Sequence, residues 1–345
     1  MDFGEFDRRK FLVGTGGAFF CTLAGHNLAL DKEADLPKLA SGVRVPPKVA
    51  AASGLEDASP AAGKRAGGPE YWIKAEKVKW EIIPTHRDQM MDVRIKGKSH
   101  FNAYGYRRYT ANFGAPMGPA SIPGPLLEVN EGETLTVHFQ NEVDVPITLH
   151  PHGIFYSNEM DGAYKGKFTD PGGFVQPKKK FTYVWEAHTG TAGNWLYHDH
   201  GPMDPVPVFK GLFGPLIVRD PSNLTPPDTE FFLFLHSFAP VATGLRSQFE
   251  CINGHAYAGN TPTLQASVGD RVAFHVVALD DDFHTFHLHG HRWTDPSGEV
   301  IDTKVMGPAE SHTFEFIEDN AGRWFYHCHV FSHLHTGMNG WYIVT

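Results

Sequence analysis

The chain has 345 residues, long enough for two domains that each bury a core of their own. Its formal net charge is -9, which excludes the basic surface typical of nucleic-acid-binding proteins, so we expect no nucleic-acid partner. Of 21 His and only 3 Cys, Cys21 lies near the N-terminus, leaving Cys251 and Cys328. If Cys328 binds a metal, no disulfide can form in the rest of the chain.

The N-terminus predicts an export signal. The pair Arg8-Arg9 precedes an uncharged, Gly-rich run up to Leu30, an order similar to a twin-arginine signal. The alternative is a membrane anchor, but the glycines and polar side chains make this run a poor membrane span. We therefore expect residues 1–30 to be a signal peptide, the protein to be exported (secreted or periplasmic), and the mature chain to lack a membrane span. Residues 31–70, rich in Ala, Pro, Gly and Lys, predict a flexible leader.

From Tyr71 onward, short runs of Val, Phe, Thr and Tyr are broken by Pro and Gly, which predicts an all-β fold of antiparallel sandwiches. The pattern is also duplicated. His150-Pro151-His152-Gly153 recurs 137 residues later as His287-Leu288-His289-Gly290, and a Gly-x-Trp-x-Tyr-His motif occurs at both 193–198 and 322–327. Repeats of this length are whole domains. We predict one domain at 71–222 and a second at 225–345.

One strand of the second half carries two sets of metal-ligand side chains. Successive side chains of a strand point to opposite faces, so His327 and His329 share one face while Cys328 lies on the other. A cysteine thiolate, the imidazole of His333 and the thioether of Met338 are the ligand types of a blue-copper centre, which needs one further imidazole. The strand therefore predicts two metal sites joined through Cys328.

The missing imidazole is predicted from strand parity. His284 stands three residues before His287, on the opposite strand face, and so turns toward the Cys328 side. The remaining candidate ligands form four His-x-His pairs, two in each half: His150 and His152, His198 and His200, His287 and His289, His327 and His329. Imidazole alone suits several metals, and the cysteine between the last pair favours copper.

The duplication also shows what the first half lacks. The positions that match the four blue-copper ligands hold Ile147, Asp199, Pro207 and Leu212. None of these provides the thiolate or imidazole of such a centre. We therefore expect the blue-copper site in the second half only.

These motifs resemble those of the multicopper oxidases, and specifically the two-domain bacterial laccases, also called small laccases. The resemblance covers about residues 71 to 345. It implies two tandem cupredoxin-like Greek-key β-sandwiches and four coppers per active unit. A type 1 copper would be bound by His284, Cys328, His333 and Met338, a type 2 copper by His150 and His287, and two type 3 coppers by His152, His198, His200, His289, His327 and His329.

The same resemblance implies a homotrimer in which each copper cluster forms between the first domain of one subunit and the second domain of its neighbour. It also places Tyr156 and Asp161 near the cluster, where they would assist electron or proton delivery. Asp302 is a weaker candidate, as a partner for a ligating imidazole.

The expected function is a laccase-type oxidase. It would oxidise phenols and similar donors by one-electron steps at the type 1 site and pass electrons through Cys328 to His327 and His329. Dioxygen would then be reduced to water. Two alternatives stay open: a metallo-oxidase acting on Cu(I) or Fe(II), and a copper nitrite reductase. The second is less favoured because that family has its blue-copper site in the first domain.

Overall fold

The computed structural model describes residues 20–23, 26–29, 67–223 and 225–345. The predicted signal and leader lie almost wholly outside the described residues. Within the unit Met1–Arg44, strands β1 (Phe20–Leu23) and β2 (His26–Ala29) pair in antiparallel fashion. The unit Val45–Thr345 holds all the other described elements and is considered by itself below.

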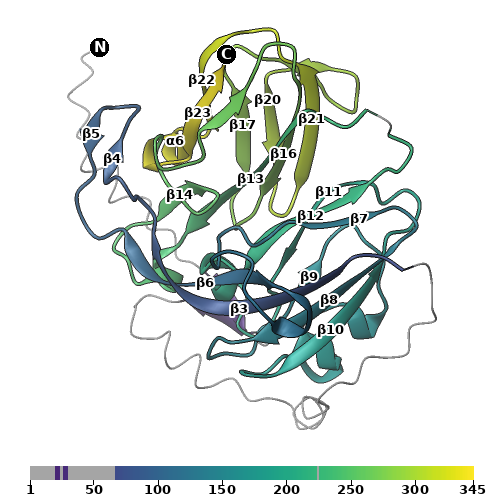
Figure 1. The fold of residues 1–345 in the computed structure, drawn as a ribbon. Helices are drawn as coiled ribbons and strands as arrows, with labels where there is room; N and C mark the ends of the chain where they lie inside the picture. Colours follow the sequence, from purple (N-terminus) through teal and green to yellow (C-terminus); the bar gives the residue numbers. More distant parts are fainter. Residues whose placement is uncertain (1–19, 24–25, 30–66, 224) are drawn as a thin grey trace. The chain divides into compact units, whose positions relative to one another are not determined.

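Residues 70–219 form an N-terminal sandwich of two four-stranded sheets, ordered β10-β8-β3-β6 and β7-β12-β11-β9 (Figure 1). Alternate side chains of β8 are buried, as expected of a strand with one face toward a core. The strands are β3 (Glu70–Glu81), β6 (His100–Tyr109), β7 (Leu127–Asn130), β8 (Thr134–Asn141), β9 (His150–Pro151), β10 (Lys180–Glu186), β11 (Gly193–His198) and β12 (Phe213–Arg219), and a small ribbon is formed by β4 (Arg87–Asp88) and β5 (Val93–Arg94).

Residues 229–344 form a C-terminal sandwich with sheets ordered β14-β13-β16-β21 and β15-β23-β22-β17-β20. Its strands are β13 (Thr229–Phe238), β14 (Phe249–Ile252), β15 (Leu264–Ala266), β16 (Arg271–Ala278), β17 (His284–Leu288), β20 (Thr303–Met306), β21 (Ser311–Ile317), β22 (Gly322–Cys328) and β23 (Asn339–Val344), with a ribbon of β18 (Trp293–Thr294) and β19 (Val300–Ile301).

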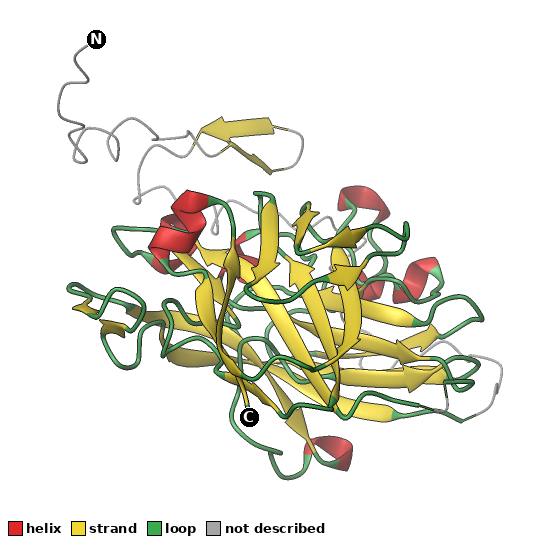
Figure 2. Cartoon of the chain, turned by 90° about the horizontal axis from the view of Figure 1, so that it is seen from above, coloured by secondary structure: helices red, strands yellow, loops and turns green. Residues whose placement is uncertain are grey.

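Helices are short and lie in loops between strands (Figure 2). The α-helices are α4 (Val206–Phe209), α5 (Pro240–Thr243) and α6 (Phe331–Thr336), and the 3-10 turns are η2 (Ala111–Phe113), η3 (Asn158–Met160), η4 (Gly166–Phe168) and η5 (Pro171–Gly173). Among the described residues, none of the helices has the length and apolar character needed to cross a membrane. The predicted all-β class with two tandem sandwiches is confirmed.

The two sandwiches share their strand order apart from the additional edge strand β20 of the C-terminal one, which is the structural form of the duplication. In each, an antiparallel pair (β11 with β12, β22 with β23) carries the Gly-x-Trp-x-Tyr-His motif. Tyr197 and Tyr326 donate hydroxyl hydrogen bonds of 2.6 Å to the Pro125 and Pro262 carbonyls. The same local sequence thus builds the same strand in both halves.

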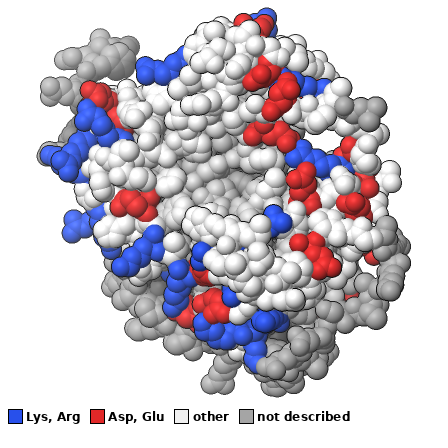
Figure 3. All heavy atoms as spheres, in the orientation of Figure 1, with Lys and Arg blue, Asp and Glu red and all other residues white. Residues whose placement is uncertain are grey.

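A core shared by the two sandwiches joins them. It contains Phe213 and Phe101 from one half and Phe234, Phe238 and Cys251 from the other. Phe213 and Phe234 are in ring contact, and Cys251 is a buried free thiol that packs as a small apolar side chain. On the face of the molecule that Figure 3 shows, acidic and basic side chains are interspersed around a hollow lined by other residue types.

Candidate metal centres

Four side chains from neighbouring segments form what we call the thiolate site: His284, Cys328, His333 and Met338. His284 begins β17, Cys328 ends β22, and His333 lies in α6. Cys328 Sγ lies 3.9 Å from His284 Nδ1 and 3.6 Å from His333 Nδ1, and the two Nδ1 atoms are 3.2 Å apart. All four side chains are buried, and Met338 packs in the same apolar cluster as Cys328. His284 therefore points toward Cys328, as the alternation of side chains along the strand predicts.

The charges around this site favour an anionic sulfur. Burial alone would raise the pKa of Cys328, but hydrogen bonds with His284 and His333 lower it to about 6. Burial would also lower the pKa of His284, yet contact with Asp280 and Cys328 raises it to about 10. Asp280 Oδ1 lies 3.0 Å from His284 Nε2, and Asp282 Oδ2 lies 3.5 Å from His333 Nε2. A carboxylate therefore contacts the Nε2 atom of each imidazole, on the side of the ring away from Cys328.

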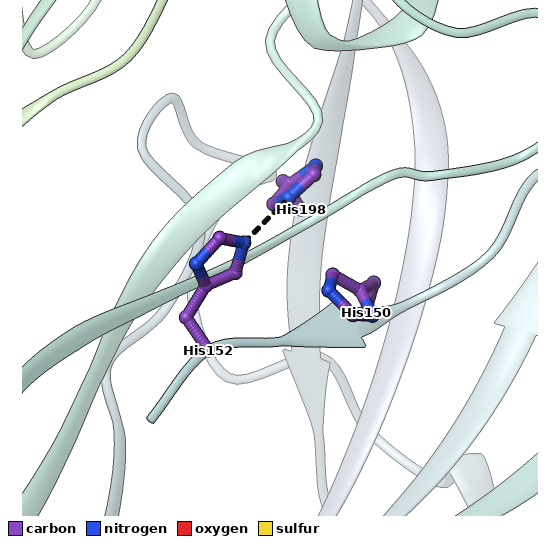
Figure 4. Close-up of side chains that lie close together, drawn as sticks. All are labelled: His150, His152 and His198. Carbon is purple, nitrogen blue, oxygen red and sulfur yellow. Dashed lines mark hydrogen bonds between the residues drawn. The ribbon is translucent and has the colours of Figure 1, made fainter. Parts of the chain in front are cut away.

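The first histidine cluster consists of His150, His152, His198 and His200, on β9, β11 and the residues that follow each strand. Ligand atoms of the first three lie within 4.8 Å of one another (Figure 4). The His200 ring is centred 5.3 Å from that of His150 and 5.7 Å from that of His198. His150 Nδ1 donates to the Asp161 carbonyl at 2.6 Å, which leaves Nε2 free to bind a metal.

The second histidine cluster consists of His287, His289, His327 and His329, and it repeats the first. Ligand atoms of the first three again lie within 4.8 Å, and the His329 ring is centred 5.5 Å from that of His287. His287 Nδ1 donates to the Asp302 carbonyl at 2.7 Å, while the Asp302 carboxylate is 4.0 Å away. Asp302 is thus the hydrogen-bond partner of the His287 imidazole through its main-chain carbonyl and not through its carboxylate.

The hydrogen bonds of the two clusters leave imidazole lone pairs available to bind a cation. His198 Nδ1 and His327 Nδ1 lie 2.7 and 2.8 Å from the carbonyls of Asp199 and Cys328, which can only accept. The Nε2 atoms of both histidines therefore carry lone pairs, and each faces a neighbouring Nε2 at 3.0 or 3.1 Å. Burial lowers the pKa of His327 to about 4, so it is neutral at pH 7, as metal binding requires.

Tyr156 and Asp161 both lie against the first cluster. The Tyr156 ring is centred 5.9 Å from that of His150, and the Asp161 carboxylate approaches His150 Nδ1 at 3.1 Å. The other oxygen of Asp161 pairs with Lys165 at 2.9 Å. The two residues are thus placed beside an imidazole, and their roles in catalysis stay a prediction.

The N-terminal counterpart of the thiolate site offers one carboxylate but no thiolate, imidazole or thioether. Ile147, Asp199 and Leu212 are fully buried, and Pro207 lies in α4. The Asp199 amide donates to the Leu212 carbonyl at 3.0 Å, as the Cys328 amide does to that of Met338 at 3.1 Å. The structure therefore aligns these positions as the duplication in the sequence does.

Sequence reasoning missed the carboxylates around the centres. Asp280 and Asp282 belong to a run of three Asp just before His284, and that run was a usable signal. Glu318, which contacts His291 at 3.0 Å, had no such signal because the two are 27 residues apart.

The sequence matches multicopper oxidase family models at residues 119–223 and 235–345. It is 33% identical over 242 residues to the probable nitrite reductase-hydroxylamine oxidoreductase fusion protein of Kuenenia stuttgartiensis, covering 65% of this chain and 28% of that protein. It is 28% identical over 293 residues to the human ferroxidase HEPHL1, covering 69% and 25%. The chain thus spans less than a third of these two relatives. A crystal structure of a multicopper oxidase superposes with a TM-score of 0.63 at 25% identity, covering 80% of this chain and 88% of the other.

Proposed function

Because the chain belongs to the multicopper oxidase family, we propose that it is an exported, laccase-type oxidase of phenols and similar donors. The observation that carries the proposal is the connection between two candidate sites. Cys328 of the thiolate site and His327 of the second histidine cluster are consecutive residues, and His327 Nδ1 also donates to the Cys328 carbonyl at 2.8 Å. An electron accepted at the thiolate site therefore has to pass only from Cys328 to the adjacent His327 to reach the second histidine cluster.

Copper at these positions would supply one-electron oxidation of a donor and the four-electron reduction of dioxygen to water. The thiolate site offers one soft sulfur, two imidazoles and a buried thioether, which suits a type 1 copper. The histidine clusters offer eight imidazoles, which suit one type 2 and two type 3 coppers. Oxygen consumption with a phenolic donor tests this function. A protein that binds copper without consuming oxygen would contradict it.

The surface beside the thiolate site favours an aromatic donor. Phe283 and Phe331 precede the ligands His284 and His333 and are 50% and 67% exposed. Exposed Phe side chains offer apolar contact to a phenol ring near the point where an electron must leave it. Replacing Phe283 with Ser should raise KM for phenols and leave the type 1 spectrum unchanged.

A metallo-oxidase acting on Fe(II) or Cu(I) is the second candidate. The Asp282 side chain is 60% exposed and lies 3.5 Å from His333, so it can attract a cation to the thiolate site, and one relative is named a ferroxidase. Asp282→Asn separates the two candidates. If a metal ion is the substrate, turnover of Fe(II) or Cu(I) should fall more than phenol turnover, because the same change also removes the carboxylate beside His333.

A copper nitrite reductase is the least favoured candidate. Part of the name of one relative is nitrite reductase. However, the type 1 ligands of this chain lie in its C-terminal sandwich, and eight imidazoles exceed the needs of a single type 2 copper. Anaerobic nitrite reduction faster than oxygen reduction would reverse this ranking.

We further propose that neighbouring subunits complete each cluster, in a homotrimer. Each sandwich gathers one set of four imidazoles, and the partly exposed His152 and the exposed His289 lie at their surfaces. Head-to-tail pairing of two different surfaces closes by rotation. Two inactive variants test it: His152→Ala with His198→Ala, and His289→Ala with His327→Ala. If co-expression restores no activity, clusters do not form between subunits.

Export by the twin-arginine route also stays a proposal, since Arg8-Arg9 lies outside the described residues. Replacing both arginines with lysine should retain the protein in the cytoplasm. Unchanged export would exclude that pathway.

A further inference from the structure

A buried carboxylate lies beside the second histidine cluster. The Glu318 side chain, just after β21, is fully buried. Its two oxygens lie 3.0 and 3.1 Å from His291 Nε2. They also accept hydrogen bonds from the Tyr342 hydroxyl and, at 3.0 Å, from the Asn320 amide. A buried carboxylate with this many donors is fixed in one orientation.

These contacts extend to the loop that carries His289. His291 Nδ1 donates to the His289 carbonyl at 2.8 Å, because a carbonyl can only accept. On the other side, Asn320 Nδ2 donates to the Gly290 carbonyl at 3.2 Å. Glu318 thus holds residues 289–291 from both sides, through His291 and through Asn320.

The N-terminal sandwich holds its equivalent loop in another way. Gly132 and Gly269 donate to the carbonyls of Ala187 and Glu318, at 2.6 and 2.8 Å, so these two residues are counterparts. The positions of His291, Glu318 and Tyr342 are apolar there: Ile154, Ala187 and Leu216. The loop is held instead by two backbone hydrogen bonds between Phe155 and Glu186, of 3.0 and 2.8 Å.

From this contrast we propose that Glu318 is a positioning residue. Through His291 it fixes the 289–291 loop and thereby the His289 imidazole, one of the second-cluster ligands. The effect is expected in that cluster, because the hydrogen bonds of Glu318 lead to the 289–291 loop through His291 and Asn320. This inference rests on the proposed function, since its readout is the reaction with dioxygen.

Glu318→Leu tests the role of the carboxylate. It keeps the bulk and removes every acceptor. Loss of a group bonded directly to a metal ligand lowers activity roughly 10- to 100-fold, and Glu318 acts on His289 only through His291, so reoxidation of the reduced protein by dioxygen should slow by at most about 10-fold. Reduction by a phenol and the type 1 absorption should not change. Glu318→Gln, whose amide can accept from Asn320 and donate to His291, should recover most of the rate.

Thr261→Val is the matched control. Thr261 is buried in the same sandwich and donates to the Asn339 carbonyl at 2.7 Å, so this variant loses buried hydrogen bonding that does not involve the 289–291 loop. Its reoxidation rate should equal that of the wild type. A similar slowing in Thr261→Val would show general loss of stability and overturn the proposal.

Two variants of His291 separate positioning from packing. His291→Asn keeps a donor close to the His289 carbonyl, whereas His291→Phe keeps the ring and loses the donor. We expect Asn to reoxidise faster than Phe, and the reverse order would make His291 a packing residue. If the wild type consumes oxygen but Glu318→Leu reoxidises equally fast, only this inference fails. If the wild type consumes no oxygen, the proposed function fails.

Discussion

Asp199 and Cys328 occupy the same position of the two sandwiches but have opposite electrostatic surroundings. Each side chain accepts from an equivalent backbone amide: Thr148 donates to Asp199 Oδ1 at 2.7 Å and Thr285 donates to Cys328 Sγ at 3.3 Å. Burial raises the pKa of Asp199 to about 8, whereas the histidines beside Cys328 lower the pKa of that thiol to about 6 against the effect of burial.

The difference teaches that this buried position becomes an anionic ligand only when imidazoles surround it. In the N-terminal sandwich Ile147 and Pro207 stand where His284 and His333 stand in the C-terminal one, so backbone hydrogen bonds from Thr148 and Gly201 only partly offset the desolvation of a charge on Asp199. The same position of the fold thus carries a neutral aspartic acid at pH 7 in the N-terminal sandwich and a thiolate in the C-terminal sandwich.

The largest expected effect comes from removing the thiolate. Cys328→Ser should abolish both the blue absorption and oxidase turnover, because a hydroxyl is not the soft anionic ligand that a type 1 copper needs. The reverse change, Asp199→Cys, should create no second blue centre, since Ile147, Pro207 and Leu212 offer no donor. Absorption spectra and oxygen uptake measure both outcomes. Retained colour in Cys328→Ser would refute the assignment.

A smaller effect concerns the acid in the N-terminal sandwich. In the unfolded chain Asp199 releases its proton near the ordinary aspartate pKa of 3.8, whereas the folded protein keeps it up to about pH 8. Between these values the folded state binds more protons, so the free energy of unfolding falls as pH rises, by at most on the order of 5 kcal/mol.

Asp199→Asn should remove this slope, because an amide does not ionise. Relative to wild type, its stability should rise between about pH 4 and pH 8 and then level off. Denaturant unfolding with a copper chelator present measures it. Parallel pH curves for the two proteins would show that Asp199 is ionised in the folded state.

The smallest effect compares the two cluster loops. Gly153 and Gly290 have φ of +71° and +73°, and an added Cβ would lie 1.9 Å from the Trp195 ring and 2.6 Å from the Trp324 ring. Alanine at either position should cost about 1–3 kcal/mol in backbone strain. Gly153→Ala should cost more because of its closer contact. Equal melting temperatures for the two variants would contradict this ranking.

Much of this arrangement could be predicted from the sequence. Strand alternation alone placed His284 on the Cys328 side, and the repeat offsets matched Asp199 with Cys328. The carbonyl partners of the imidazoles could not be predicted, because main-chain groups of Asp161 and Asp302 leave no mark in a sequence.

The carboxylate contacts are of a similar kind. Glu318, His291 and Tyr342 come from three separate segments, and only the folded sandwich brings them together. Only after the strands are superimposed do the apolar residues at the matching N-terminal positions show that a buried carboxylate holds the cluster loop in one sandwich and not in the other.

The most direct test of the account is a copper count with optical and EPR spectra on the purified wild-type protein. We predict four coppers per chain, one of type 1, one of type 2 and two of type 3. Two coppers per chain, one of type 1 and one of type 2, would contradict the account, because the eight histidines would then not form a trinuclear cluster.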